Sequence, residues 1–159
     1  MFNASADQRV LGYLGRALSL ELSAVQLYST QAQLVGAWGL AEPAARLKAE
    51  AQEELGHADR IIGRMLSLNV APNASQLRPV RLGGSLQALL QHDLAFEYEL
   101  ISLYDEATRY CASQGDADNR LFFEALLGEE QAHAQELTQW IGTLEQPGAT
   151  RRPTRGATF

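Results

Sequence analysis

Residues 53–59 read Glu-Glu-Leu-Gly-His-Ala-Asp and place a glutamate, Glu54, three positions before a histidine, His57. Three residues make nearly one turn of an α-helix, so both side chains project from one face and can bind one metal ion. The same spacing recurs at Glu130 and His133. These two Glu-x-x-His pairs predict two helices that contribute to a shared metal site.

Two further glutamates stand alone on apolar helical faces, and their positions match those of the pairs. The interval from Glu21 to Glu54 equals the interval from Glu97 to Glu130. One constant offset, the distance along the chain from Glu21 to Glu97, therefore relates the first half of the sequence to the second, and we call it the repeat offset. The two halves of the chain differ in local sequence but share this spacing between glutamates. The shared spacing indicates that the same arrangement of glutamates occurs twice in the fold.

The composition fits one helical domain. A chain of 159 residues with 46% apolar and 20% charged residues can bury one substantial core. No leader peptide and no apolar stretch long enough to cross a bilayer is recognisable, so we expect a cytoplasmic protein without a membrane partner. Cys111 is the single cysteine, and a net charge of −6 argues against nucleic-acid binding and favours cations.

Apolar periodicity predicts four helices, over about residues 6–37, 42–68, 85–111 and 118–144. Ser5 and Gln8 resemble a capping box at the start of the first helix. Each of the two equal intervals between glutamates is centred on a predicted turn, at 37–38 and at 113–114. Two antiparallel hairpins folded at these turns would bring the carboxylates of each hairpin to one height.

The segment 69–82 contains two prolines and has no helical pattern, so we interpret it as a linker between the hairpins. It reaches roughly 46–50 Å when extended, which is enough for a crossover along the bundle. The predicted fold is all-α, a four-helix bundle of two antiparallel hairpins joined by a long crossover. Residues 1–146 form this domain, and residues 147–159 form a flexible tail rich in Pro, Gly and Arg.

Carboxylate and imidazole side chains in a bundle core suit two metal ions, either iron, manganese or a mixed pair. One Glu from each of two helices and Glu-x-x-His from each of the other two is the arrangement of ferritin-like di-iron proteins. The six predicted ligands are Glu21, Glu54, His57, Glu97, Glu130 and His133.

The resemblance is closest to bacterioferritins. It covers roughly residues 8–145 and rests on Leu20-Glu21-Leu22 with Tyr28, Glu54-Leu55-Gly56-His57-Ala58-Asp59, Asp93-Leu94-Ala95-Phe96-Glu97 and Glu129-Glu130-Gln131-Ala132-His133. It implies a ferroxidase that oxidises Fe²⁺ with O₂ or H₂O₂ and passes ferric iron to a mineral store. The implied roles are terminal ligands Glu21 and Glu97, bridging ligands Glu54 and Glu130, and imidazole ligands His57 and His133.

Two features depart from the family pattern. Bacterioferritins carry a haem-binding methionine directly after the bridging glutamate, whereas this chain has Leu55, which has no lone pair to offer iron. Haem is therefore not expected, and Met65 is interpreted as a core residue. The tail lacks the short fifth helix of the family. We therefore expect a homo-oligomer of at least a dimer, without predicting whether it forms the cage of the family.

Several residues beside the six predicted ligands have more than one interpretation. Glu53 and Glu129 are interpreted as solvated, although each lies four residues before a histidine and could compete as a ligand. Asp93 is either a carboxylate that holds a histidine N–H or a water-bridged core residue. Tyr28 and Tyr104 are interpreted as packing residues with a hydrogen-bonded hydroxyl, and the resemblance also makes Tyr28 a candidate electron donor.

Two alternative functions remain at this stage. One is a di-iron peroxidase or oxidase that resembles rubrerythrin without its cysteine-ligated iron domain. The other is a structural subunit that co-assembles with a haem-bearing ferritin. Oligomeric mass distinguishes the second alternative from a self-sufficient ferroxidase.

Overall fold

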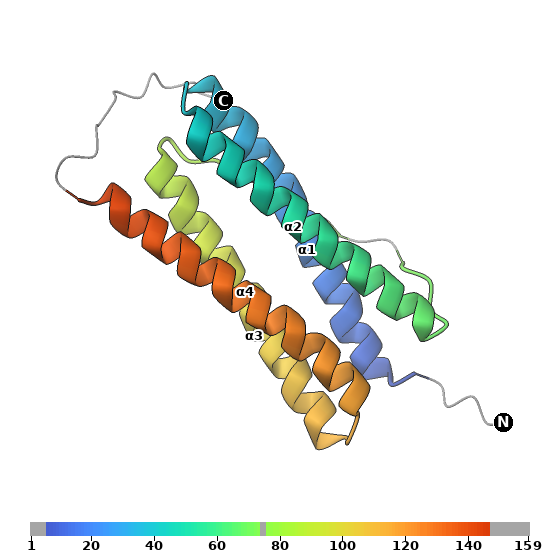
Figure 1. Ribbon diagram of the computed structural model, residues 1–159. Helices are drawn as coiled ribbons and strands as arrows, with labels where there is room; N and C mark the ends of the chain where they lie inside the picture. Colours follow the sequence, from blue (N-terminus) through green and yellow to red (C-terminus); the bar gives the residue numbers. More distant parts are fainter. Residues whose placement is uncertain (1–5, 74–75, 147–159) are drawn as a thin grey trace.

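The structure, a computed structural model, describes residues 6–73 and 76–146. Its helices are α1 (Gln8–Ala37), α2 (Ala41–Ser67), α3 (Leu86–Ser113) and α4 (Ala117–Leu144). Helices α1 and α2 form one antiparallel hairpin, α3 and α4 form a second, and the two pack side by side (Figure 1). The predicted all-α four-helix bundle is confirmed. Among the described helices, none is long and apolar enough to cross a membrane.

Both predicted hairpin turns are present and depend on glycine. Gly39 has φ +81° between α1 and α2, and Gly115 has φ +71° between α3 and α4. A left-handed backbone after a helix favours glycine, because a Cβ atom would clash with the following carbonyl. The chain thus reverses direction near the midpoint of each of the two equal intervals between glutamates. The glutamates on α2 and α4 therefore lie at the same level along the bundle as those on α1 and α3.

The first helix begins differently from the prediction. Its N-cap is Asp7, whose carboxylate accepts hydrogen bonds from the backbone N–H groups of Arg9 at 2.7 Å and Val10 at 3.3 Å. The capping box predicted at Ser5 is replaced by this carboxylate, since Gln8 is already the first helical residue, and Ser5 itself lies outside the described residues. An aspartate is as good an N-cap as a serine, and it also suits the positive end of the helix dipole.

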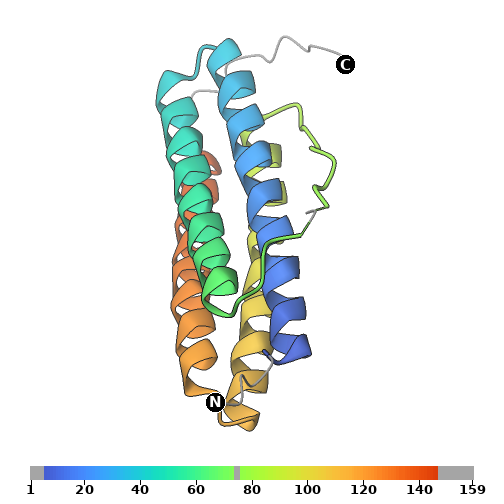
Figure 2. The same cartoon turned by 90° about the vertical axis from the view of Figure 1, so that its right-hand side faces the viewer.

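The linker between α2 and α3 runs along the bundle, as its length predicted (Figure 2). Helix α1 holds it through two serines, because the N–H of Gln76 donates to Ser19 Oγ at 3.3 Å and the N–H of Arg78 donates to Ser23 Oγ at 3.0 Å. The Arg78 guanidinium also lies 2.6 Å from a Glu99 carboxylate oxygen on α3. The crossover therefore ties the two hairpins together.

All four helices contribute fully buried apolar side chains to one core, including Leu14, Leu47, Leu100 and Leu126. Met65 is buried, as predicted, and Cys111 is buried as well. Carboxylates interrupt this apolar core at mid-length. The domain boundary at residue 146 stays a prediction, and the predicted tail at 147–159 lies outside the described residues.

The N-cap of α4 provides a test of how the second hairpin is fixed. Asp116 accepts hydrogen bonds from the backbone N–H of Asn119 at 3.1 Å and from its side-chain amide at 2.6 Å. We expect Asp116→Ala to lower the free energy of unfolding by about 1–2 kcal/mol, since an orphan helix donor loses its partner. Urea denaturation of the metal-free protein measures this.

Asp118→Ala is the matched control for that substitution. Asp118 is an exposed carboxylate in the first turn of the same helix, so its removal changes the charge near the helix dipole and leaves the cap in place. A loss of at most about 0.5–1 kcal/mol is expected. Equal effects of the two substitutions would contradict the capping role of Asp116.

Candidate metal centre

The six residues predicted as ligands meet in the middle of the bundle. Helix α1 supplies Glu21, α2 supplies Glu54 and His57, α3 supplies Glu97, and α4 supplies Glu130 and His133. All four glutamates have no exposed surface, and the histidines are 4% and 7% exposed. Burial of four carboxylates is costly unless positive charge meets them. A cluster of this kind indicates a site built for cations.

The ligand atoms form two groups that share two members. Glu21 and His57 belong to one group, Glu97 and His133 belong to the other, and Glu54 and Glu130 belong to both. Within each group the candidate atoms lie within 4.8 Å of one another. Two carboxylates between two sets of terminal donors can bridge a pair of metal ions.

Many of these donor atoms make no hydrogen bond. Buried atoms of this kind are the ones that a bound metal ion would use. Glu130 Oε1 lies 2.8 Å from His57 Nδ1, and His133 Nδ1 lies 3.1 Å from Glu54 Oε1, yet neither contact has hydrogen-bond geometry. Within the described ranges, buried atoms without hydrogen bonds include Glu21 Oε2, Glu54 Oε1, Glu97 Oε2, both carboxylate oxygens of Glu130 and His133 Nδ1. Unpaired oxygen and nitrogen donors that converge on a common space suit iron or manganese.

The far side of each imidazole contacts a carboxylate from the opposite hairpin. His57 Nε2 lies 2.9 Å from Glu129, and His133 Nε2 lies 2.9 Å from Glu53. These contacts fix the ring orientation and leave Nδ1 facing the cluster. Glu53 and Glu129 were interpreted as solvated, and their side chains are indeed 60% and 45% exposed, but each also orients a histidine. Glu50 joins Glu53 and His133 in a third, peripheral group of candidate ligand atoms that was not predicted from the sequence.

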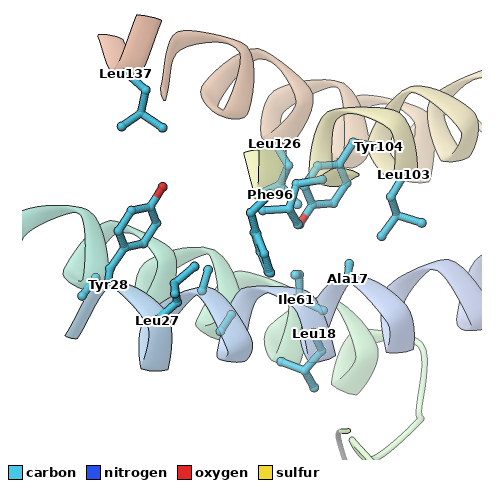
Figure 3. Close-up of a cluster of buried hydrophobic side chains, with 14 of the residues drawn as sticks. Ala17, Leu18, Leu27, Tyr28, Ile61, Phe96, Leu103, Tyr104, Leu126 and Leu137 are labelled. Atoms are coloured by element: carbon cyan, nitrogen blue, oxygen red, sulfur yellow. The ribbon is translucent and has the colours of Figure 1, made fainter. Parts of the chain in front are cut away.

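Each isolated glutamate also accepts a hydrogen bond from a tyrosine of the opposite hairpin. Tyr28 on α1 donates to Glu97, and Tyr104 on α3 donates to Glu21. Both rings point from their own hairpin toward the other (Figure 3). Both tyrosines are buried with a hydrogen-bonded hydroxyl, as predicted. Tyr104 holds one oxygen of Glu21 and leaves the other for a metal.

Asp93 is buried as predicted, but its partner is different. Its carboxylate accepts a hydrogen bond from the Gln31 amide at 2.6 Å, so Asp93 does not hold a histidine N–H. Glu129 and Glu53 occupy that role at the two imidazoles. Gln31 was not identified from sequence, because a buried glutamine on a helix carries no spacing signal of its own.

The electrostatics of the site follow from this arrangement. Burial alone would lower the pKa of His133, but the carboxylates of Glu130 and Glu54 raise it to about 12. The pKa of His57 is likewise held well above its usual value by Glu130, Glu21 and Glu54. Burial would raise the pKa of Glu130, but the two histidines close to its carboxylate lower it to about 2. Two imidazolium rings therefore balance ionised Glu54 and Glu130 in the metal-free protein.

The two terminal glutamates behave in the opposite way. Burial, together with the charges of Glu54 and Glu130, raises the pKa values of Glu21 and Glu97 well above the usual carboxyl range. Without a metal, burial therefore favours the protonated form of these two side chains. A pair of divalent cations would replace the protons of the two histidines and the two terminal glutamates.

Comparison with known proteins places the site in context. A sequence model described as the ferritin-like domain matches residues 11–146. The bacterioferritin of Rhodobacter capsulatus is 39% identical over 89% of this chain and 88% of its own length, and the bacterial ferritin of a Synechocystis strain is 35% identical over 87% and 90%. A solved structure of the Rhodobacter capsulatus protein superposes with a TM-score of 0.85 at 38% identity, covering 89% of this chain and 88% of that one. That structure is described as having a metal-free dinuclear site and a haem iron.

The raised histidine pKa values give a prediction for metal binding. Because His57 and His133 are protonated in the metal-free site, a cation must displace their protons. We expect the affinity for Co²⁺, a redox-stable probe, to rise as the pH increases, with release of protons on binding. Calorimetric titrations in two buffers of different ionisation enthalpy measure that release. Binding without proton release at pH 6.5–7.5 would contradict the charge state described here.

Asp93 gives a prediction for stability against pH. Burial raises its pKa to about 7, although the Gln31 amide opposes the shift. At Asp93 the folded protein therefore holds a proton that the unfolded chain loses between about pH 4 and 7, so this residue makes the free energy of unfolding fall as the pH rises through this window. Asp93→Asn keeps an acceptor for Gln31 and should remove a decline of up to about 4 kcal/mol, at about 1.4 kcal/mol per pKa unit.

Thermal or urea unfolding of the metal-free protein at pH 5 and pH 8 measures this effect. Asp105→Asn is the matched control, since Asp105 is a carboxylate on the same helix whose side chain is 44% exposed. Its variant should keep the pH profile of the wild type. Superimposable profiles for Asp93→Asn and the wild type would contradict the burial of an ionisable Asp93.

Proposed function

Because this chain belongs to the bacterioferritin family of ferritin-like proteins, we propose that it is a ferroxidase that oxidises Fe²⁺ to Fe³⁺ in iron storage and detoxification. The electron acceptor is O₂ or H₂O₂. Two iron ions bind in the mid-bundle cluster, where carboxylate and imidazole donors suit both oxidation states. Manganese or a mixed pair is accommodated by the same donors, and metal analysis of the isolated protein distinguishes them.

The observation that carries this proposal is the sharing of Glu54 and Glu130 between two groups of donors. In the proposed assignment Glu21 and His57 bind one ion, and these two shared carboxylates bridge it to the second. On the far side, the second ion is bound by Glu97 and His133. The carboxylates supply negative charge that stabilises Fe³⁺ over Fe²⁺, and therefore favours loss of an electron.

The surrounding residues support the same assignment. Tyr28 and Tyr104 fix one oxygen of each terminal glutamate, so that the other can turn toward a cation. Glu129 and Glu53 hold the outer imidazole nitrogens, which leaves the inner nitrogen for a metal. Positioning of this kind limits the rearrangement that metal binding requires.

We propose a homo-oligomer without the family's usual haem. Leu55 on α2 is 48% exposed and lies where a haem-binding methionine would be expected. Leu66, which is 57% exposed, and the half-buried Ile62 share its face of the helix, and such a row of apolar side chains favours contact with a second chain. Native mass distinguishes a dimer, a homomeric cage and a species that assembles only with a haem-bearing ferritin.

An aerobic Fe²⁺ titration of the metal-free protein tests the function. Ferric absorbance should rise rapidly up to two irons per chain, one for each group of donors. Glu130→Ala removes a ligand from both groups, so we expect loss of the rapid phase to the buffer level. Glu21→Ala removes a ligand from one group alone and should reduce the high-affinity Co²⁺ stoichiometry to one per chain.

Glu136→Ala is the control for these substitutions, because Glu136 is an exposed glutamate on α4, six residues beyond Glu130. It should leave both the rapid phase and the stoichiometry unchanged. Uptake far beyond two irons per chain would add a mineral store to the proposal. Oxidation of Fe²⁺ by the wild type at no more than the rate in buffer would contradict the ferroxidase assignment.

A further inference from the structure

A pocket that contains none of the six candidate metal ligands lies where the linker runs between α1 and α3. Its volume is about 370 Å³. Helix α1, the linker and α3 each provide a wall, and the lining includes Leu27, residues 78–81, His92, Phe96 and Glu99. Small-molecule sites in proteins occupy roughly 300–1,000 Å³, so a space of this size suits a small ligand.

The charged groups of this pocket are mainly cationic, although the protein has a net charge of −6. Arg78 and Arg81 line the pocket together with a single carboxylate, that of Glu99. The side chain of Arg81 is exposed and makes no ion pair, hydrogen bond or ring contact with residues 6–73 or 76–146. A guanidinium without an acidic partner on an acidic protein is available to an anion.

Arg78 is held at the pocket by contacts with both neighbouring helices. Its backbone N–H donates to Ser23 Oγ on α1 at 3.0 Å. Its guanidinium lies 2.6 Å from Glu99 through Nη1 and 5.5 Å from the centroid of the Phe96 ring. A guanidinium carries five N–H groups, so donors remain for a ligand after this ion pair is made. Because the side chain is already positioned, a ligand loses less binding free energy to ordering it.

His92 on α3 adds an imidazole that has no hydrogen-bond partner. The ring is half-buried, its Nδ1 is shielded from solvent, and neither nitrogen makes a hydrogen bond to the described residues. No hydrogen bond therefore fixes the ring, which can turn to present an N–H group to the pocket. Leu27 and Phe96 are buried and supply apolar wall. The pocket thus combines N–H donors with apolar surface.

We propose that this pocket binds a small phosphate ester. The planar fork of a guanidinium matches two phosphate oxygens, which makes Arg78 and Arg81 suitable partners for a phosphate dianion. The imidazole of His92 donates a further hydrogen bond to the phosphate. The organic part of the ester packs against the apolar wall. This binding site goes beyond the proposed ferroxidase function and does not depend on iron.

A ligand in this position contacts α1, the linker and α3 together. The linker is otherwise held to α1 through the two backbone hydrogen bonds to Ser19 and Ser23. A bound ester adds contacts between the linker and both hairpins, so it opposes local opening of the crossover. We therefore expect ligand binding to slow amide hydrogen exchange in residues 76–82.

Calorimetric titration of the metal-free protein tests the site, with phenyl phosphate and inorganic phosphate as separate probes in chloride buffer. Arg81→Ala should weaken binding of phenyl phosphate about tenfold or more, the loss expected for one charge-assisted hydrogen bond. His92→Leu should weaken it as well. Arg109→Ala is the matched control, because it removes the same charge from an arginine on α3 that pairs with Asp105 outside the pocket. Its affinity should equal that of the wild type.

Hydrogen exchange followed by mass spectrometry locates the bound probe. Phenyl phosphate should slow exchange in peptides that cover residues 76–82 and leave the α3–α4 turn at 113–116 unchanged. Tighter binding of phenyl phosphate than of inorganic phosphate would support the ester, whereas equal or weaker binding would overturn it and assign the site to free phosphate. Absence of binding at millimolar concentrations of either probe, or equal losses in Arg81→Ala and Arg109→Ala, would overturn the pocket as a phosphate site.

Discussion

The burial of four carboxylates against two imidazole rings is the constraint on which the rest of the molecule depends. Ionised Glu54 and Glu130 are balanced by protonated His57 and His133. Burial raises the pKa values of the other two glutamates and so favours their protonated form until a cation arrives. Such a cluster is stable only if all its members lie at one height in the bundle. The two equal intervals between glutamates, each folded at a glycine turn, produce that alignment.

The same constraint explains why the contacts at the site run between hairpins. Tyrosine hydroxyls cross from α1 to α3 and from α3 to α1, and carboxylates cross between α2 and α4. Each contact has a counterpart at the repeat offset, so the site has approximate two-fold symmetry. The symmetry ends beyond the cluster, where Gln31 and Asp93 meet on one side while aromatic rings occupy the other.

The six candidate ligands and the hairpin turns could be predicted because their signals lie in spacing along the chain. Hydrogen-bond partners on different helices could not be predicted, because they depend on how one helix is rotated against another. Gln31 meets Asp93 only because α1 and α3 face each other at that level, and Glu53 on α2 orients a histidine that lies on α4. The N-cap was misplaced because Ser5 and Asp7 are both good caps, and only the fold decides which of them is used.

The most direct test of this account is a crystal of the protein soaked anaerobically with Fe²⁺ and measured on both sides of the iron absorption edge. The account predicts two anomalous peaks at mid-bundle, one beside Glu21 and His57 and the other beside Glu97 and His133, with the two shared glutamates between them. A single peak, or iron found only at the peripheral group that contains Glu50, would contradict it.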